Sequence, residues 1–533
     1  MKILNSLCLL VCLLCVFPDV YSAPAVPELT PAYDVLIRGA RVLDGSGNPW
    51  FRADIGVRGD RIVALGQLST AVGRRQIDGR ELIAMPGFID THSHTSDALI
   101  SEDRSGVPAL LAQGITTVLV NPDGGGAVDL PAQARSLAAH GLGVNTGQMV
   151  PHGSIRQQVM GHQDRHAEPA ELARMAELVR AGMEWGAFGL SSGPFYAPGS
   201  FAPNAEFVAL ARIAGEYGGV YASHIRDESN YSIGLLAAID EVIEVAREAR
   251  VTGVVTHIKA LGPPVWGLSR AATARIESAR AAGISVYTDQ YPYAASSTSL
   301  GAALLPRWAM ADSFVGALSD PGQGELYRAV QENLARRGGA DRISFSRSSE
   351  NPEVVGKTLS TIAQEKEIAP VDAALALLDR GNPGIISFNM QDEDIEHFMR
   401  QEWNMTASDG AYPVWESGAP HPRGFGTFPR KFRLYVYDKK VISLPFAVRS
   451  MTSLPAQVYG IKGRGQLAVG AYADIVLIDP HTISDRATFA KPYQLAEGVT
   501  YVLVNGQLAW GPDGVGEGRY GRLLRREQGE PRE

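Results

Sequence analysis

The sequence predicts an α/β fold: a (β/α)8 TIM-type barrel with a β-sandwich built from both chain ends and a small inserted subdomain. Three observations lead to this prediction. Short alternating strands occur near each end of the chain, strand and helix patterns alternate between them, and histidines and carboxylates recur where the barrel strands are expected to end. With 533 residues, of which 45% are hydrophobic and 20% charged, the chain is long enough for two or three structural units.

The predicted sandwich comprises residues 33–86 and 455–512. Residues 33–43 and 54–65 have the alternation of strands, and Gly59-Asp60 is typical of a hairpin turn. Residues 473–478 and 499–506 have the same short-strand character. The two ends therefore are expected to form one sandwich with a large domain between them. The Gly- and Arg-rich tail after Gly511 is expected to end in a frayed terminus.

The central region, residues 87–454, has the pattern of a parallel barrel. Its strands are predicted to end near His92, Val120, Val150, Ser191, His224, His257, Asp289 and Asp409. Helical patterns cover residues 129–140, 171–185 and 228–250. The region near 311–370 is too long for one crossover and predicts an inserted subdomain.

The first residues resemble a targeting segment. Lys2 precedes a short apolar run over residues 9–17, and small residues follow near Ser22 and Ala23. This predicts a signal peptide over residues 1–22 and a protein exported to the periplasm or secreted. Cys8, Cys12 and Cys15 all lie in this leader, so a mature chain would offer no thiol to a disulfide or a metal.

Composition also narrows the partners. The formal net charge is −8 and no basic cluster stands out, which argues against nucleic acid. No segment after the leader has the pattern of a membrane span, so we expect no membrane association after signal removal. A small-molecule substrate remains as the expected partner, and the sequence does not indicate the oligomeric state.

The chemistry is concentrated in side chains at the predicted strand ends. His92 and His94 are one residue apart, so they can point to the same side of an extended segment. In a parallel barrel the carboxyl ends of all strands meet on one face, which brings in further candidates: Asp123, His224, His257 and Asp409. Four imidazoles and one bridging carboxylate can hold two divalent metals, which leaves Asp409 as general base and acid.

The chain resembles the amidohydrolase superfamily and, within it, the D-aminoacylase (N-acyl-D-amino-acid deacylase) family. Pro86-Gly-Phe-Ile-Asp-Thr-His-Ser-His94 is similar to the metal motif of the superfamily. Further segments resemble the D-aminoacylase branch: Gly114-Ile-Thr-Thr-Val118, Gly189-Leu-Ser-Ser-Gly-Pro-Phe-Tyr196, Ser223-His-Ile-Arg-Asp-Glu228, His257-Ile-Lys259, Asp289-Gln-Tyr-Pro-Tyr293, Ser408-Asp-Gly410 and His421-Pro-Arg423. The resemblance covers nearly the whole chain after the leader.

The resemblance implies a metal-dependent barrel enzyme that hydrolyses the amide bond of N-acyl-D-amino acids to a carboxylate and a D-amino acid. It implies one or two divalent ions, most commonly zinc, with Mn²⁺ or Co²⁺ as alternatives. The implied metal ligands are His92, His94, Asp123, His224 and His257, and Asp409 is the implied general base and acid. Four further residues are implied to hold the α-carboxylate of the substrate: Lys259, Tyr291, Ser297 and Arg423.

One position departs from the family. The family commonly has a cysteine in Asn-Cys-Gly after the second strand, and the corresponding residues here are Pro122-Asp123-Gly124. A carboxylate can still bridge two metals but is a harder ligand than a thiolate. We therefore expect weaker zinc retention, and more tolerance of Mn²⁺ or Co²⁺, than at a cysteine site.

Other readings of the sequence stay open. A dipeptidase acting on peptides with a C-terminal D-residue needs the same carboxylate anchor. A cyclic-amide hydrolase is disfavoured because such enzymes use a carboxylated lysine on the fourth strand, and Gly189-Leu-Ser-Ser192 offers none. A catalytically silent binding protein is disfavoured by the full ligand set. Arg307 is expected at the surface rather than at an acidic substrate group, and His152 is equally consistent with the pocket wall and with packing.

Overall fold

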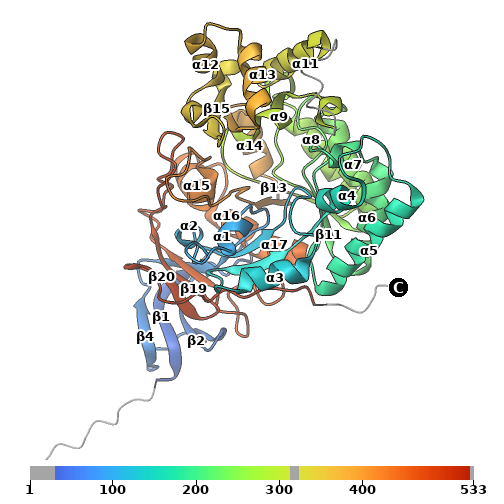
Figure 1. The fold of residues 1–533 in the computed structure, drawn as a ribbon. Coiled ribbons are helices and arrows are strands. Elements are labelled where there is room, and N and C mark those ends of the chain that lie inside the picture. Colours follow the sequence, from blue (N-terminus) through green and yellow to red (C-terminus); the bar gives the residue numbers. More distant parts are fainter. Residues whose placement is uncertain (1–30, 312–322, 528–533) are drawn as a thin grey trace, which may run out of the picture.

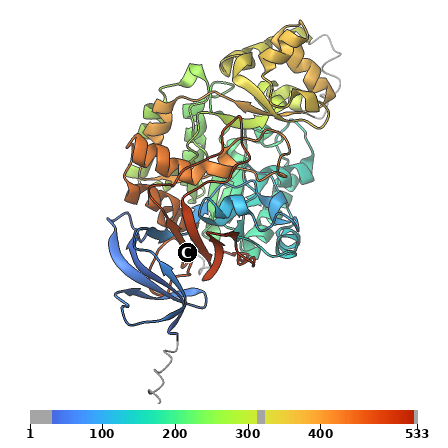
Figure 2. The ribbon, with the colours of Figure 1, turned by 90° about the vertical axis from the view of Figure 1, so that its left-hand side faces the viewer.

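The computed structural model describes residues 31–311 and 323–527. The predicted signal peptide lies outside these residues. The barrel occupies the middle of the molecule, the sheet of the chain ends lies at one end, and the insert lies at the other (Figures 1 and 2). Among the described residues, no helix combines the length and the apolar character needed to span a bilayer.

Strands from both chain ends form one nine-stranded sheet. Its order is β21-β20-β19-β18-β5-β1-β2-β3, with β4 beside β1. The strands are β1 (Tyr33–Val42), β2 (Phe51–Arg58), β3 (Arg61–Gly66), β4 (Gly73–Asp78), β5 (Ile83–Pro86), β18 (Ile475–Ile478), β19 (Val499–Val504), β20 (Gln507–Gly511) and β21 (Gly514–Val515). A bridge from Arg61 to Tyr472 brings the edge strand β3 back beside the segment before β18, so the sheet folds over an apolar core shared by both ends.

The apolar run from Ile83 to Ile89 is divided between two strands. β5 ends at Pro86 in the nine-stranded sheet, and β6 (Phe88–Asp90) begins the barrel. Gly87 separates them, and a Cβ at this position would lie 2.1 Å from the Thr116 hydroxyl. Its N–H donates to the carbonyl of Asp474. The break lets one run of sequence contribute to two sheets.

The barrel strands are all parallel and follow each other in chain order. They are β6, β7 (Ile115–Val120), β8 (Asn145–Gln148), β9 (Val150–Pro151), β10 (Gly189–Ser192), β11 (Val220–Ser223), β12 (Thr252–Val255), β13 (Val286–Gln290) and β17 (Asn404–Thr406). The segments after β17 and β6 pair through the parallel bridge of Ser93 with Gly410. The Asp409 N–H donates to the His92 carbonyl at 2.9 Å, so the ring closes beside the candidate site.

Helices cover the outside of the barrel. They are α1 (Ser96–Leu99), α2 (Pro108–Leu111), α3 (Leu130–Ala138), α4 (His152–Met160), α5 (Pro169–Trp185), α6 (Asn204–Glu216), α7 (Leu235–Glu248), α8 (Ser269–Ala281), α14 (Asp392–Met399), α15 (Arg423–Arg430), the π-helix η6 (Lys431–Asp438), α16 (Leu444–Met451) and α17 (Ser453–Tyr459). The helix predicted from residue 228 begins only at Leu235. The Asp227 carboxylate accepts N–H groups of Ser229, Ser232 and Gly234, which holds this stretch as a loop.

The insert is a separate unit with its own apolar core. Its antiparallel sheet has the order β14 (Ser296–Ser299), β16 (Gly384–Ser387), β15 (Ile343–Arg347). Four helices pack with it: α9 (Leu300–Leu304), α11 (Gln323–Arg336), α12 (Leu359–Glu365) and α13 (Pro370–Arg380). The unit therefore runs from Ser296 to Ser387, wider than the predicted 311–370.

The tail after β21 packs on the barrel through residues 521–526, and the predicted frayed terminus lies outside the described residues. Gly521 and Leu523 form bridges with Leu142 and Thr146 beside the start of β8. The Thr146 N–H donates to the Arg522 carbonyl at 2.9 Å, and the Leu524 N–H returns a bond to the Thr146 carbonyl at 2.8 Å. Such backbone pairing cannot be recognised from Gly- and Arg-rich composition.

Candidate metal centre and active site

Six candidate residues converge at the carboxyl ends of the barrel strands. His92 and His94 follow β6, and Asp123 follows β7. The remaining three follow β11, β12 and β17, and are His224, His257 and Asp409. Five of the six border a cavity of about 650 Å³, whose wall also includes β14 of the insert. His92 lies beneath it, with 1% of its side chain exposed.

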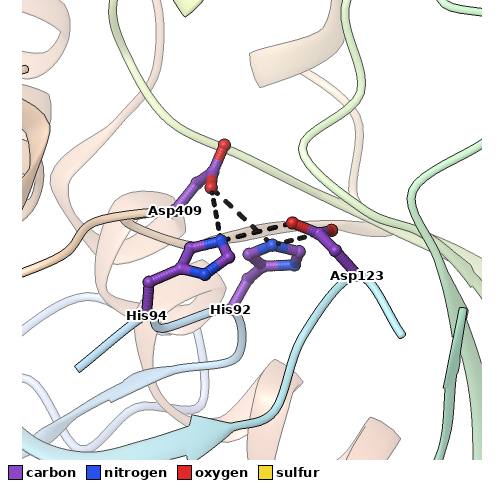
Figure 3. Close-up of side chains that lie close together, drawn as sticks. All are labelled: His92, His94, Asp123 and Asp409. Carbon is purple, nitrogen blue, oxygen red and sulfur yellow. Dashed lines mark ion pairs between the residues drawn. The ribbon is translucent and has the colours of Figure 1, made fainter. Parts of the chain in front are cut away.

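The Asp123 carboxylate lies at the centre of the cluster. Its Oδ1 is 3.2 Å from His92 Nε2, 3.6 Å from His224 Nδ1 and 3.3 Å from His257 Nε2. Its Oδ2 is 3.2 Å from His94 Nε2. Asp409 also faces the first two histidines, with Oδ1 3.2 Å from His94 Nε2 (Figure 3). The six residues form two potential ligand groups that share Asp123.

These residues fit a divalent metal pair. His92 Nε2 and both ring nitrogens of His224 are buried without a hydrogen bond, an arrangement that proteins otherwise avoid. Two ligand atoms on one tetrahedral zinc are roughly 3.4 Å apart when each bond is about 2.1 Å. The separations around Asp123 match this ligand-to-ligand spacing. Imidazole and carboxylate donors suit Zn²⁺, Co²⁺ and Mn²⁺.

Electrostatics also favour positive charge here. Burial lowers the pKa of His94, but Asp123 and Asp409 outweigh it and raise that pKa to about 10. Burial raises the pKa of Asp123, yet His92 and its neighbours hold it well below the usual value. Both carboxylates are thus ionised, and this concentration of negative charge favours positive charge between them.

Three site residues have left-handed backbones, which is uncommon outside glycine. Asp123, His257 and Asp409 have φ values of 55°, 36° and 48°. Buried carboxylates support two of these turns: Asp289 Oδ1 accepts the His257 N–H at 2.6 Å, and Asp90 Oδ1 accepts the Ser408 N–H at 2.8 Å. All three side chains border the cavity.

Beside the metal ligands lies a group of donors suited to a carboxylate. Two cations lie close to the Tyr291 ring. The Lys259 ammonium is 5.6 Å from the ring centroid, and the Arg423 guanidinium is 4.6 Å from it. The Tyr291 hydroxyl is buried without a partner. Arg423 also lies 2.7 Å from Asp409 Oδ2. Burial raises the pKa of Asp409, but Arg423 and the histidines bring it far below the usual value, so Asp409 is ionised.

Ser297 borders the same cavity but is already engaged. Its hydroxyl donates to the Ile385 carbonyl at 3.0 Å, so its proton is not directed to a ligand. The neighbouring hydroxyls are engaged as well: that of Ser296 contacts Asn389, and that of Ser299 caps α9. A contact of Ser297 with substrate stays a prediction.

Sequence reasoning gave no role to Glu228. This carboxylate is 4% exposed, and its Oε1 lies 2.5 Å from Lys259 Nζ and 3.1 Å from His257 Nδ1. Burial raises its pKa, but Lys259 and the histidines lower it well below the usual value. The available signal was its position four residues after His224.

His421, in the segment His421-Pro-Arg423, is a second residue to which the sequence assigned no role. It accepts the Arg423 N–H at Nδ1 and contacts the Ala295 carbonyl through Nε2, at 3.1 and 3.0 Å. Burial holds its pKa well below the usual value, so the ring is neutral. The residue ties the start of α15 to the segment before β14.

Arg307 and His152 are both held by neighbouring side chains. Arg307 is not a solvated surface residue: its guanidinium stacks 4.0 Å from the Phe195 ring centroid, and burial lowers its pKa to about 10. His152 is fully buried and bonds Glu206 at 2.8 Å, as the packing interpretation expects.

Comparison with known proteins agrees with this geometry. The Amidohydrolase family model matches residues 349–509. The chain is 36% identical to an N-acyl-D-glutamate deacylase of Alcaligenes xylosoxydans xylosoxydans, over 93% of this chain and 97% of that protein. Among solved structures it is similar to the N-acyl-D-glutamate deacylase of Bordetella bronchiseptica, complexed with zinc and a phosphonate inhibitor. That match has TM-score 0.80 and 33% identity, and covers 92% and 99% of the two chains.

A D-aminoacylase structure described with a binuclear metal centre matches with TM-score 0.80 and 32% identity, over 93% of this chain and 100% of that one. These full-length similarities confirm the predicted fold class and the resemblance. Because a relative above 30% identity is covered almost completely, the chain belongs to the D-aminoacylase (N-acyl-D-amino-acid deacylase) family of the amidohydrolase superfamily.

Proposed function

We propose that this protein hydrolyses the amide bond of N-acyl-D-amino acids, giving a carboxylate and a D-amino acid. One observation carries the proposal: the ligand set around Asp123 and the donors around Tyr291 share one cavity. A substrate with an amide next to a carboxylate fits this pair of sites. Its stereochemical preference is supported by the relatives, which act on D-configured substrates.

The ligands would be His92, His94, Asp123, His224 and His257. A divalent metal bound there would lower the pKa of a water and polarise the amide carbonyl. Zinc is the first candidate because a relative was crystallised with it, and the carboxylate at position 123 favours tolerance of Mn²⁺ or Co²⁺.

Asp409 would move the proton. Its Oδ1 faces His92 and His94 at 3.7 and 3.2 Å, on the metal side, and its other oxygen faces Arg423. In this position it can accept a proton from the attacking water and pass it to the nitrogen of the leaving amine. The bond to nitrogen breaks, the acyl carbon gains the hydroxyl oxygen, and the amine leaves neutral.

Lys259, Tyr291 and Arg423 would hold the α-carboxylate. Arg423 can grip two oxygens with its planar fork, and Lys259 adds a point charge. Because Arg423 also pairs with Asp409, the anchor and the general base are one electrostatic unit. A carboxylate bound here places its neighbouring amide beside the metal ligands.

The substrate is expected to carry a second acidic group, on its side chain or its acyl group. Arg337 borders the cavity, is 1% exposed, and has its Nε 2.7 Å from the Tyr231 hydroxyl. Arg307 lies close by over Phe195. Within residues 31–311 and 323–527 neither guanidinium has a carboxylate partner at ion-pair distance. A fully buried cation that borders the cavity, with a half-buried second one nearby and no counter-ion for either, favours an anionic ligand.

The decisive assay uses matched substrates and the purified protein with Zn²⁺, Co²⁺ or Mn²⁺. N-acetyl-D-glutamate, N-acetyl-D-glutamine and N-acetyl-D-leucine are compared with their L-forms and with dipeptides ending in D-residues. We expect cleavage of the D-compounds, fastest for the glutamate. Faster cleavage of dipeptides would move the assignment to a D-specific dipeptidase, and turnover of L-compounds alone would contradict the proposal.

Arg337→Gln tests the second acidic group separately. It should reduce the advantage of N-acetyl-D-glutamate over N-acetyl-D-glutamine while leaving N-acetyl-D-leucine cleavage unchanged. Equal loss with all three substrates would mean that Arg337 supports the fold of the insert rather than substrate selection.

We also propose that residues 1–22 direct export and are removed. The support is the charged start, the apolar run and the small residues near Ala23 in the sequence. Fractionation of expressing cells followed by N-terminal sequencing tests this. A cytoplasmic protein that retains Lys2 would contradict it.

A further inference from the structure

One carboxylate, Glu228, faces two metal-ligand histidines from behind. His257 turns Nε2 toward Asp123 at 3.3 Å and Nδ1 toward Glu228 Oε1 at 3.1 Å. His224 turns Nδ1 toward Asp123 Oδ1 at 3.6 Å and Nε2 toward Glu228 Oε2 at 3.8 Å. Each ring thus lies between two carboxylates, one on the metal side and one behind.

We propose that Glu228 is the positioning residue that fixes which nitrogen each of these histidines offers to the metal. The proposal rests on the metal-dependent function proposed above. A metal-bound imidazole carries its proton on the other nitrogen, and that N–H needs an acceptor that sets the ring orientation. The hydrogen-bond contact with Glu228 leaves Nε2 of His257 for the metal, and Glu228 faces Nε2 of His224 from 3.8 Å, which leaves Nδ1 of that ring for the metal.

Lys259 cannot take this role. Its Nζ lies 2.7 Å from His257 Nδ1 and 2.5 Å from Glu228 Oε1. An ammonium has no acceptor, so it cannot receive the Nδ1–H of a metal-bound His257. With a metal on Nε2, both Lys259 and His257 therefore donate to Glu228. The carboxylate links the substrate anchor to the metal ligands.

The two histidines differ in how directly they are held. The 3.1 Å contact with His257 is a hydrogen-bond distance, whereas the 3.8 Å contact with His224 is longer than a hydrogen bond. The His224 ring is held additionally by Phe195 and Tyr196, whose ring centroids are 5.3 and 4.7 Å away. The larger effect of Glu228 is therefore expected on His257.

The test measures metal binding to the apoprotein and needs no substrate, so it stands apart from the assay of the proposed function. Zn²⁺ and Co²⁺ are titrated against a competing chromophoric chelator with wild type and Glu228→Gln. Loss of an acceptor behind a ligand commonly weakens metal binding 10- to 100-fold. We expect a loss of affinity in this range for the ligand group that contains His224 and His257. Unchanged affinity would overturn the proposal.

Three variants separate positioning from fold and charge. Glu241→Gln is the matched control, because Glu241 pairs with Arg226 at 2.9 Å, outside the ligand groups; it should bind metal as wild type. Lys259→Met should also keep wild-type affinity. In Glu228→Gln/Lys259→Met the net charge is that of wild type, so full recovery of affinity would reduce Glu228 to a charge-balancing role and overturn the proposal.

Folding is checked by the near-ultraviolet circular dichroism of each apoprotein. Should Glu228→Gln not fold, Glu228→Asp keeps the charge but withdraws the oxygens from both rings. Metal binding weakened in Glu228→Asp with a wild-type spectrum supports positioning, and wild-type affinity in that variant contradicts it.

Discussion

The buried Lys431 predicts that the stability of the protein rises with pH above neutrality. Its side chain is 3% exposed at the start of η6, and Nζ donates to the hydroxyls of Thr406 and Ser450 at 2.7 and 2.9 Å. No carboxylate of the described residues lies within ion-pair distance of it. Burial in these surroundings lowers the pKa of Lys431 from 10.5 to about 7.

The direction of the pH dependence of stability follows from proton binding to Lys431. Between about pH 7 and pH 10.5 the unfolded chain holds a proton on Lys431 and the folded chain does not, so stability rises with pH. Below pH 7 both states are protonated, and the full penalty for burying the charge remains. From pH 7 to pH 9 the linkage relation gives about 2 kcal/mol of added unfolding free energy.

The assay compares wild type with Lys431→Met by urea unfolding at pH 7, 8 and 9. Other groups titrate equally in both proteins, so the difference between them isolates Lys431. We expect the unfolding free energy of wild type to rise by about 2 kcal/mol relative to that of the variant between pH 7 and pH 9. A difference that stays constant with pH would show that the folded ammonium is charged, and would refute the reasoning.

Four further predictions concern the site and the tail. Asp409→Asn should lower kcat by about 10²- to 10⁴-fold and leave the metal content of the purified protein unchanged; loss of metal as well would make Asp409 a ligand. Arg423→Met should lower kcat/KM by about 10- to 100-fold, because charged hydrogen bonds of roughly 1.5–3 kcal/mol are removed; an unchanged value would exclude it from the anchor. Asp123→Cys should slow the loss of zinc to a chelator, and faster loss would contradict the argument from ligand hardness. A chain ending at Gly518 should be at least about 4 kcal/mol less stable than one ending at Glu527, because four backbone hydrogen bonds of the tail are removed, in addition to side-chain bonds such as that of Asn505 to the Tyr520 carbonyl; equal thermal unfolding midpoints would contradict it.

The position of the site could be predicted because barrel topology fixes where strand ends meet. His92, His224, His257 and Asp409 each follow a strand by a few residues, so parallel strands bring them to one face. This prediction needed only the strand pattern and the residue types. The residues that hold the substrate carboxylate could not be predicted in this way and were assigned from the family resemblance.

Other features depend on contacts that the sequence pattern does not encode. The residue between the two sheets is glycine, Gly87, because Thr116, 29 positions further on, leaves no space for a Cβ. The start of α7 is delayed because the Asp227 side chain captures backbone N–H groups. Glu228 gains its place only when β11 and β12 lie side by side and bring His257 and Lys259 to it.

The left-handed backbones at the site explain why residue type is restricted there beyond chemistry. Each of Asp123, His257 and Asp409 sits in a conformation that costs roughly 1–3 kcal/mol for a residue with a Cβ. Asp, Asn and His adopt it more readily than β-branched residues. The chain therefore uses metal-binding and proton-transfer side chains that also tolerate the required turn, and the turns are what aim Asp123 between two pairs of histidines.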